Sequence, residues 1–261
     1  MLAEERHRLI TAMVARDGQV TVAALSEEFG ITRETARRDL ALLEQQGTVR
    51  RVHGGAVPAA QASTAEESLS RRTTLRHSEK QRIAARALEL IPAGAASVAI
   101  DAGTTTELLA QLLAETATGP RAAELLVITH AVPIAYRISS AAEIALEVLG
   151  GRVRGLTSAA VGDQVLDRLD QLRPDIAFVG TNGLDAGFGL STPDPLEASV
   201  KSAIVRGARR VVVLADSSKL GVETLVRFAG LEDIDTLVTD AEPPAALAEA
   251  LAAADVDVVL A

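Results

Sequence analysis

The chain has 261 residues and a formal net charge of −9, and its hydrophobic content of 48% is ordinary for a soluble globular protein. It contains no cysteine, which excludes disulfides, thiolate chemistry and cysteine-ligated zinc. The first residues are acidic and amphipathic, unlike a signal peptide, and no apolar run reaches the about 18 residues of a membrane span, so we expect a cytoplasmic protein with no membrane partner.

The charge is distributed unevenly along the chain. Residues 1–57 contain eight arginines and eight acidic residues, so the whole negative excess falls in residues 58–261. Within residues 31–57, five arginines face three acidic residues. The N-terminal part can therefore present a local basic face to nucleic acid, with a modest phosphate footprint per subunit.

The N-terminal part predicts three helices and a short hairpin. Apolar spacing predicts helices over 4–16, 22–29 and 33–46, and alternation predicts a strand over 49–52. Threonines precede the second and third helices as caps and glycines follow them, namely Thr21, Thr32, Gly30 and Gly47. This order of elements is the layout of a winged helix-turn-helix, which reads DNA with one helix in the major groove.

The third predicted helix has one apolar and one polar face. Ala36, Leu40 and Leu43 form the apolar stripe, whereas Glu34 and Arg38 point almost opposite. A solvated amphipathic helix is the alternative interpretation, but the neighbouring helix, turn and hairpin favour DNA binding. The predicted DNA contacts from this helix and the hairpin are Thr32, Arg33, Glu34, Thr35, Arg37, Arg38, Arg50, Arg51 and His53.

This region resembles DeoR-type bacterial transcriptional regulators. The resemblance lies in Thr35-Ala36-Arg37-Arg38-Asp39-Leu40, Leu43-Glu44, Gly47 and Arg51-Val52-His53-Gly54-Gly55-Ala56. It implies a sequence-specific DNA-binding domain over residues 1–57.

The remainder of the chain predicts a linker and an α/β domain. Residues 58–77 lack periodicity and are expected to be a linker, and Ser78-Glu79-Lys80-Gln81 predicts a capping box at the start of a helix through Ile91. Apolar runs that alternate with helical segments then predict a mainly parallel sheet over residues 78–261. The predicted strands are 97–101, 125–129, 144–149, 175–180, 210–215, 236–239 and 256–260.

Polar loops follow several of the predicted strands. The carboxyl ends of parallel strands meet at one edge of the sheet, where open α/β sheets bind ligands. The loop at Gly103 opens a helix, so its amides and hydroxyls have the character of a phosphate cradle, although a simple capping loop is equally compatible. The predicted ligand contacts in these loops are Asp101, Gly103, Thr104, Thr105, Thr106, Thr129, His130, Gly180, Thr181, Asn182, Gly183, Asp185 and Lys219.

Glu197 and Lys201 stand one helical turn apart. Taken alone, they predict an exposed ion pair. Lys201 and Lys219 are, however, two of only three lysines in the chain, and both adjoin the polar loops. A phosphate needs amides, hydroxyls and a cation, so Glu197 and Lys201 join the predicted binding residues for a small phosphorylated sugar or polyol.

The same family resemblance extends through the second domain. It lies in Asp101-Ala102-Gly103-Thr104-Thr105, Leu149-Gly150-Gly151, Val161-Gly162, Gly183, Gly187-Phe188-Gly189-Leu190, Lys201 and Asp216-Ser217-Ser218-Lys219. It implies a sensor domain for phosphorylated sugars, similar in fold to ribose-5-phosphate isomerases and coenzyme A transferases. His130 departs from the asparagine usual in the family, and Leu184-Asp185-Ala186-Gly187 lacks the paired acids of the isomerase site.

Two functions follow from these observations. The first is a repressor of carbohydrate genes, with operator DNA and a phosphorylated sugar as partners and with no catalytic residue, metal or cofactor. A homo-oligomer, dimer or tetramer, is expected because two-fold operators need paired domains, and induction and corepression both remain open. The second is a sugar-phosphate isomerase or transferase that uses Glu197 and Lys201 as an acid–base pair.

Overall fold

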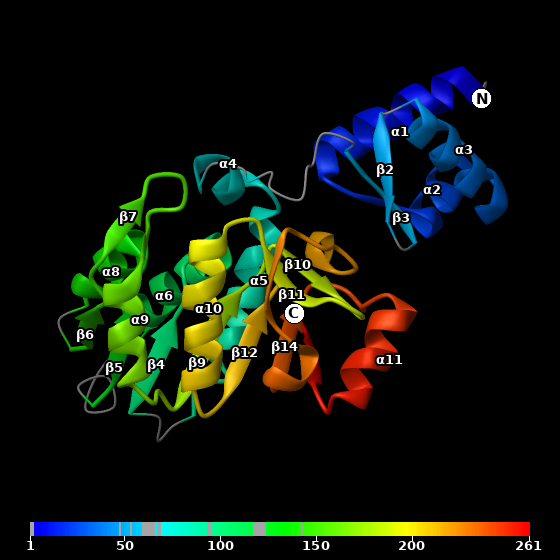
Figure 1. Cartoon of the computed structure of the whole chain (residues 1–261). Coiled ribbons are helices and arrows are strands. Elements are labelled where there is room, and N and C mark those ends of the chain that lie inside the picture. The colour runs from blue at the N-terminus through cyan, green and yellow to red at the C-terminus, as the bar shows by residue number, and fades with distance from the viewer. Residues whose placement is uncertain are drawn as a thin grey trace. The chain divides into compact units, whose positions relative to one another are not determined.

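The computed structural model describes residues 3–46, 48–52, 54–58, 66, 69–92, 96–116, 124–141 and 143–261. Gly47 and His53, predicted above as a helix end and a DNA contact, lie outside these residues. The chain divides into two compact units, Met1–Ala65 and Glu66–Ala261, each described by itself (Figure 1). In the described residues, every helix is too short or too polar to cross a membrane.

The smaller unit is a winged helix-turn-helix. Its helices are α1 (Ala3–Asp17), α2 (Val22–Phe29) and α3 (Arg33–Gln45), and its antiparallel sheet has the order β1-β3-β2, with β1 at Val20–Thr21, β2 at Val49–Val52 and β3 at Gly55–Pro58. The predicted caps are confirmed: the side chains of Thr21 and Thr32 accept the amides of Ala24 and Thr35. The predicted hairpin is β2 paired with β3, and strand β1 is an addition to the predicted elements.

Two consecutive glycines form the turn and the close contact of this small sheet. Gly54 has φ +80°, in the left-handed region that favours glycine. A Cβ on Gly55 would lie 1.9 Å from the carbonyl oxygen of Val20, so the pairing of β3 with β1 requires a residue without a side chain there. The sheet packs on a core that includes Ile10, Leu25 and Leu40.

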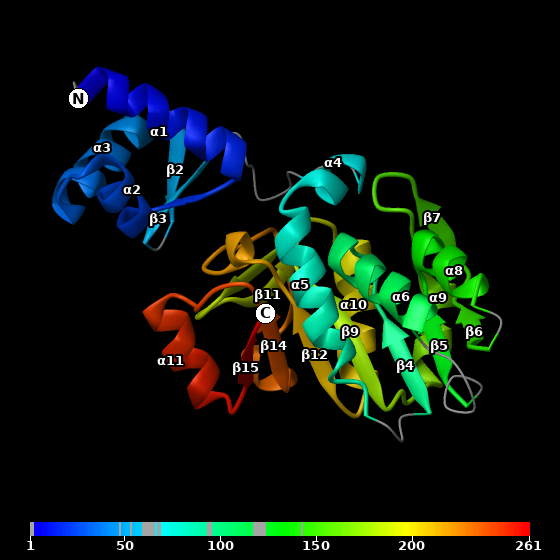
Figure 2. The ribbon, with the colours of Figure 1, turned by 180° about the vertical axis from the view of Figure 1, so that it is seen from behind.

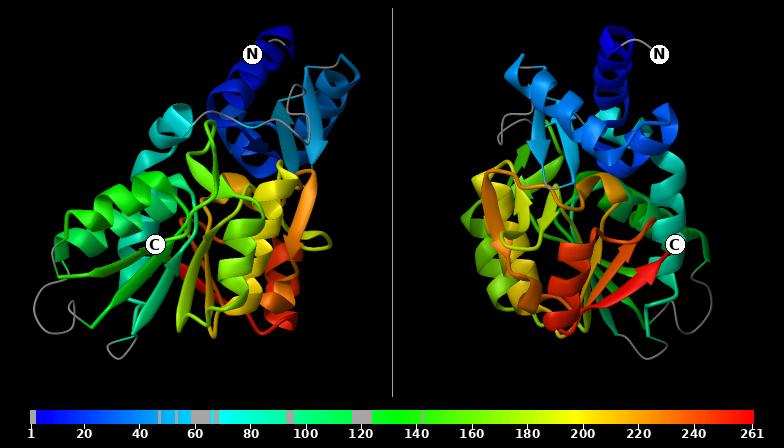
Figure 3. Two further views of the ribbon diagram at one scale, coloured as in Figure 1. Left: turned by 60° about the vertical axis from the view of Figure 1, so that its left-hand side comes forward. Right: turned by 90° about the vertical axis from the view of Figure 1, so that its right-hand side faces the viewer.

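The larger unit is built on a seven-stranded parallel sheet with the order β15-β14-β12-β9-β4-β5-β6. All seven strands fall in the predicted apolar runs. The five inner strands are largely buried, as expected for strands covered on both faces, whereas the edge strands β6 and β15 are partly exposed. At one edge β14 and β15 lie side by side, with α11 packed beside them (Figure 3). The bounds are β4 Ser97–Ile100, β5 Leu126–Thr129, β6 Ala145–Val148, β9 Ile176–Gly180, β12 Val211–Leu214, β14 Thr236–Thr239 and β15 Asp257–Leu260.

Helices cover both faces of the sheet. On one face lie α5 (His77–Leu88), α6 (Thr104–Thr116) and α8 (Val132–Ser139), and on the other lie α9 (Asp163–Asp170), α10 (Pro195–Gly207) and α11 (Ala245–Ala253) (Figures 1 and 2). Successive strand residues alternate between the two cores, so Val98 and Ile100 join one and Ala99 joins the other.

The predicted capping box of α5 is wrong. The helix begins at His77, directly after Arg76, whose φ of +51° places it in the left-handed region. The Ser78 hydroxyl therefore lies inside the first turn, where it donates to the Glu79 carboxylate rather than capping the helix.

Several short elements add to the predicted ones. A hairpin pairs β7 (Arg152–Arg154) with β8 (Ala159–Val161), and a second antiparallel sheet joins β10 (Gly183–Asp185), β11 (Gly189–Thr192) and β13 (Val226–Ala229). Helix α4 (Leu69–Thr74) lies within the expected linker and belongs to the larger unit. Two 3₁₀ turns are η1 (Ser217–Lys219) and η2 (Leu231–Asp233).

Candidate functional site

The centre of the parallel sheet is a topological switch point. From β4 the chain proceeds to β5 on one side, and later reaches β9 on the other side. Connections that leave in opposite directions open a crevice at the carboxyl ends of the strands, which is where open α/β sheets bind ligands. Asp101, Gly180 and His130 stand at these ends.

The Asp101 carboxylate is the centre of this constellation. It is completely buried, and its Oδ2 accepts hydrogen bonds from the ammonium of Lys201 and from the amide of Gly180, the latter at 3.0 Å. Its Oδ1 lies 3.1 Å from Nε2 of His130. One side chain thus joins β4, β5, β9 and α10 at the switch point.

Asp101 and Lys201 each have partners that favour their charged forms. Burial raises the pKa of Asp101, but the opposing charge of Lys201 and the hydrogen bond with His130 together hold that pKa below its usual value. Lys201 also donates to the Gly180 carbonyl at 2.9 Å, and its Nζ lies 5.7 Å from the ring centroid of Phe228. An ammonium has three N–H donors, and these two bonds use two of them.

His130 lies between Asp101 and strand β8 and contacts both. Its Nδ1 lies 2.8 Å from the carbonyl oxygen of Ala160 in β8, and because a carbonyl only accepts, Nδ1 carries the proton of that bond. The amide of Ala102 lies 3.3 Å from Nε2. Both ring nitrogens therefore have protein partners, and the buried ring connects Asp101 to β8.

The first turn of α6 adjoins Asp101. The amide of Glu107 donates to the Gly103 carbonyl at 2.9 Å, and the Thr106 hydroxyl donates to the same oxygen at 2.9 Å. The amides that precede Glu107 are those that an α-helix leaves without an intrahelical acceptor, and they carry the positive end of the helix dipole. Gly103, Thr104 and Thr105 thus stand where an anion is favoured.

The exposed ion pair between Glu197 and Lys201 is wrong as a prediction. Both residues are buried, 5% and 4% exposed, and they reach different partners. Glu197 accepts hydrogen bonds from Arg154 and Thr157, whereas Lys201 bonds Asp101. One helix therefore connects two separate charged clusters.

Arg154 and its partners were absent from the predicted site. The guanidinium lies 2.9 Å from the Glu66 carboxylate and 3.1 Å from that of Asp194, in addition to its bond with Glu197. Burial lowers the pKa of Arg154, but the hydrogen bond to Glu66 and the charge of Glu197 outweigh burial and raise it. The one available signal was an arginine within the glycine-flanked stretch between Gly151 and Gly162 of an otherwise acidic domain.

Other predicted contacts use their polar groups internally. The Asp185 carboxylate accepts the amides of Gly187 and Phe188 at 2.8 and 3.0 Å, so it stabilises its own turn. Further side chains bond neighbouring backbone or side chains in the same way: Thr129 with Ile100 at 2.7 Å, Thr181 with Gly183 at 2.6 Å, and Asn182 with Thr192 at 3.0 Å.

Lys219 belongs to a different group of charges. It lies in η1 after β12, and its charge, together with hydrogen bonding from Ser218, outweighs burial and lowers the pKa of Asp216. Arg76 bonds Ser217 at 2.9 Å and lies 3.7 Å from both Asp216 and Asp240. This group ties the start of α5 to the ends of β12 and β14.

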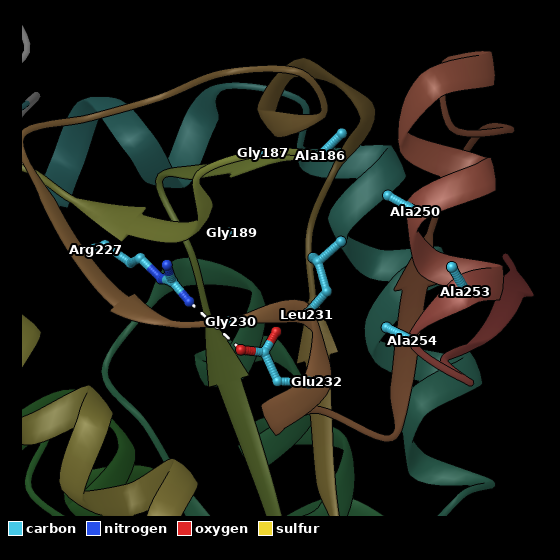
Figure 4. A pocket seen from close by; sticks show the side chains of 10 residues that line it. All are labelled: Ala186, Gly187, Gly189, Arg227, Gly230, Leu231, Glu232, Ala250, Ala253 and Ala254. Carbon is cyan, nitrogen blue, oxygen red and sulfur yellow. Dashed lines mark ion pairs between the residues drawn. The ribbon is translucent and has the colours of Figure 1, made fainter.

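A separate hollow of about 380 Å³ lies between α11 and the second antiparallel sheet (Figure 4). Its lining is mostly alanine and glycine, and Arg227 and Glu232 pair at 3.6 Å on the side away from α11. It contains none of the predicted ligand contacts.

In the smaller unit, the arginines predicted to bind DNA lie on the surface. Arg33, Arg37 and Arg38 of α3 are exposed, as are Arg50 and Arg51 of β2. Glu34 lies 3.7 and 3.6 Å from Arg37 and Arg38, but exposed pairs of this kind contribute little and leave the guanidiniums accessible. The hydroxyls of Thr32 and Thr35, 2.8 Å apart, cap the helix.

Two acidic residues of the resemblance hold this unit together. Asp39 is buried and accepts hydrogen bonds from Arg6 at 2.7 Å and His7 at 2.7 Å, which fixes α3 against α1. Burial raises the pKa of Asp39, but the bonds from Arg6 and His7 lower it overall. Glu44 accepts the amide of Arg51 at 2.8 Å, which joins α3 to β2.

Two family models match the chain. The DeoR-like helix-turn-helix domain matches residues 6–62, and the DeoR C terminal sensor domain matches residues 75–241. The HTH-type transcriptional regulator GlpR of Haloferax volcanii is 36% identical over 99% of this chain and 98% of its own length. The glycerol-3-phosphate regulon repressor of Escherichia coli is 31% identical over 96% of both chains.

Among solved structures, ribose 5-phosphate isomerase A from Methanocaldococcus jannaschii is 22% identical and covers 54% of this chain and 53% of its own, with a TM-score of 0.38. A likeness of this degree says nothing about shared function.

Proposed function

The chain belongs to the DeoR family of transcriptional regulators, and we propose that it represses carbohydrate genes under the control of a phosphorylated sugar. It is a DNA-binding regulator and not an enzyme. Its relatives include a repressor named for a glycerol-3-phosphate regulon, which supports a small phosphorylated polyol or sugar as the effector class.

The proposed division of labour follows the chain. Residues 1–57 bind operator DNA, residues 58–77 link the domains and residues 78–261 sense the effector. In the first part, α3 enters the major groove, where Arg33, Arg37 and Arg38 meet phosphates or guanine edges. Arg50 and Arg51 add contacts from the hairpin. A homo-oligomer supplies the second recognition helix that a two-fold operator requires.

The observation that supports the sensor site most strongly is the buried Lys201–Asp101 pair beside the first turn of α6. The effector phosphate is assigned to the amides and hydroxyls of Gly103, Thr104 and Thr105, with the Lys201 ammonium as the cation. Asp101 then holds the ammonium in place, and Gly180 faces the polyol part of the ligand.

The isomerase alternative is not favoured. An acid–base pair needs two side chains aimed at one substrate, whereas Glu197 is bonded to Arg154 and Thr157 and Lys201 to Asp101. Asp185 is committed to its own turn.

A thermal-shift screen tests the proposed effector class. Because a ligand that binds the folded state raises stability by mass action, a phosphorylated sugar is expected to raise the melting temperature in a concentration-dependent way, and its unphosphorylated parent is not. Glycerol 3-phosphate and the common hexose 1- and 6-phosphates form the first panel. Equal shifts by parents and phosphates, or no shift by any phosphate, would remove the proposed phosphate site.

A further inference from the structure

We call Asp101, His130, Gly180 and Lys201, at the carboxyl ends of the central strands, the sheet-edge site. The β7–β8 hairpin is attached to this site through both of its strands. In β8, Ala160 accepts from His130 and donates its amide to the His130 carbonyl, each at 2.8 Å. In β7, Arg154 bonds Glu197, which lies one turn before Lys201 in α10. A displacement of Asp101 can therefore reach the hairpin through His130 and β8, and a displacement of Lys201 can reach it through Glu197 and β7.

The same hairpin holds the segment that precedes α5. We call Glu66 and residues 69–74 the α4 segment. Arg154 lies 2.9 Å from the Glu66 carboxylate, and the Leu69 amide donates to the Leu156 carbonyl at 3.2 Å. In sequence, the α4 segment follows the smaller unit and stands at the start of the larger unit.

The charges at Arg154 are unbalanced. One guanidinium serves three carboxylates, those of Glu66, Asp194 and Glu197. The Glu66 side chain is only 5% exposed, and its Oε1 has no hydrogen-bond partner in the described part of the chain. A buried carboxylate with one unsatisfied oxygen depends on its remaining partner, so the position of Glu66 depends on Arg154, for which Asp194 and Glu197 compete.

We propose that Arg154 is the positioning residue that couples the sheet-edge site to the α4 segment. This inference rests on the proposed function, because it explains how occupancy of the site reaches the DNA-binding unit. A ligand that shifts α10 moves Asp194 and Glu197 together, since Asp194 caps the helix in which Glu197 lies. Arg154 then pairs more closely either with Glu66 or with the carboxylates of α10. Pairing with Glu66 holds the α4 segment, and pairing with α10 releases it.

The test uses the full chain without any ligand, so that its outcome does not depend on which effector binds. Hydrogen exchange of the α4 amides is compared in the wild type, Glu66→Gln and Glu197→Gln. Each substitution removes one charge at Arg154 without a change of shape. The matched control is Glu147→Gln, which breaks the Arg168–Glu147 pair of 2.6 Å on other elements.

Both test variants are expected to change the exchange rates of the α4 amides several-fold, and the control variant is expected to leave them unchanged. The effect of Glu197→Gln is the decisive one, because Glu197 lies on α10 and not on the α4 segment. The second readout is affinity for a DNA duplex that the wild type selects from a random pool. Each single variant is expected to change the duplex affinity. The fold-change in the double variant Glu66→Gln/Glu197→Gln is expected to differ from the product of the two single fold-changes, because both carboxylates share Arg154 as their partner.

A structural role for Arg154 alone would lower the melting temperature of Glu197→Gln while leaving α4 exchange and duplex affinity at wild-type values. That result would overturn the proposal, as would independent effects in the double variant. If Glu197→Gln fails to fold, Arg154→Lys, which keeps the charge but loses the planar fork, replaces it in the same comparison. Failure of the thermal-shift screen with coupling intact would instead refute the effector class alone.

Discussion

Lys201 and Asp101 form a buried ion pair across 100 residues of chain, and this pair joins α10 to the end of β4. Asp101 is completely buried and Lys201 is 4% exposed, so neither charge is stable there without the other. The pair stands at the switch point of the sheet, with the first turn of α6 beside it. A cation next to a helix N-terminus is the arrangement that a phosphorylated ligand requires.

The first prediction concerns this pair. Lys201→Met leaves the Asp101 charge buried without its cation, so we expect the sensor unit to lose about 3–5 kcal/mol of stability and the response to the effector. The double variant Asp101→Asn/Lys201→Met removes both charges and is expected to recover much of that stability without the response. Lys219→Met, which alters a lysine in η1 outside the Asp101–Lys201 pair, is the control. Thermal melts with and without the effector measure both effects, and a ligand shift retained in Lys201→Met would exclude that residue from the site.

The second prediction concerns the exposed face of α3. Arg37→Ala and Arg38→Ala are each expected to weaken binding to the selected duplex by about 1–3 kcal/mol where the arginine contacts a base, and to lower the salt slope by about one where it contacts a phosphate. Both arginines are exposed, so the melting temperature should hardly change. Anisotropy titrations at several salt concentrations give the result, with Arg16→Ala on α1 as the control. Wild-type affinity in both variants would mean that α3 does not read DNA.

The third prediction concerns Asp39 and pH. The folded-state pKa of Asp39 lies below the about 3.9 of an unfolded chain, so its pairing contributes fully above that value and is lost as pH falls through the folded pKa. Asp39→Asn is expected to cost about 1–3 kcal/mol near neutral pH and progressively less below about pH 4. Scanning calorimetry of the full chain across this range measures the difference. A constant penalty at every pH would show that the charge of Asp39 is irrelevant.

The fourth prediction concerns Gly55, the first residue of β3. Gly55→Ala would place a Cβ 1.9 Å from the Val20 carbonyl oxygen, so β1 and β3 must separate. The expected result is at least about 1–3 kcal/mol of destabilisation confined to the smaller unit, with loss of duplex binding and an unchanged effector response. Gly150→Ala, where a Cβ meets open space, should melt like the wild type. Hydrogen exchange distinguishes the two units, and normal duplex affinity in Gly55→Ala would contradict this account.

The parallel sheet was predictable because its strands are short apolar runs bounded by polar loops, and its five inner strands are largely buried. The hairpin β7–β8 and the β10–β11–β13 sheet were not, since strands of three or four residues, such as Arg152–Arg154, are too short for a periodic pattern to indicate them.

The members of the sheet-edge site were predictable one by one, but their pairing was not. Sequence spacing pairs Lys201 with Glu197, four residues away, whereas the fold pairs it with Asp101. Glu197 instead bonds Arg154, which was not among the predicted site residues. Such choices depend on which elements meet in space, and local periodicity contains no information about them. The pairing of Asp39 could not be predicted for a similar reason, because its partners Arg6 and His7 lie in α1.

The most direct test of the whole account is a titration of the selected duplex with the full chain, in the presence and absence of each phosphorylated sugar of the panel. The account predicts that one phosphorylated sugar changes the duplex affinity by about 5- to 150-fold, that its unphosphorylated parent does not, and that Lys201→Met abolishes the change. A duplex affinity that is the same with every phosphorylated sugar, or a response that survives in Lys201→Met, would contradict it.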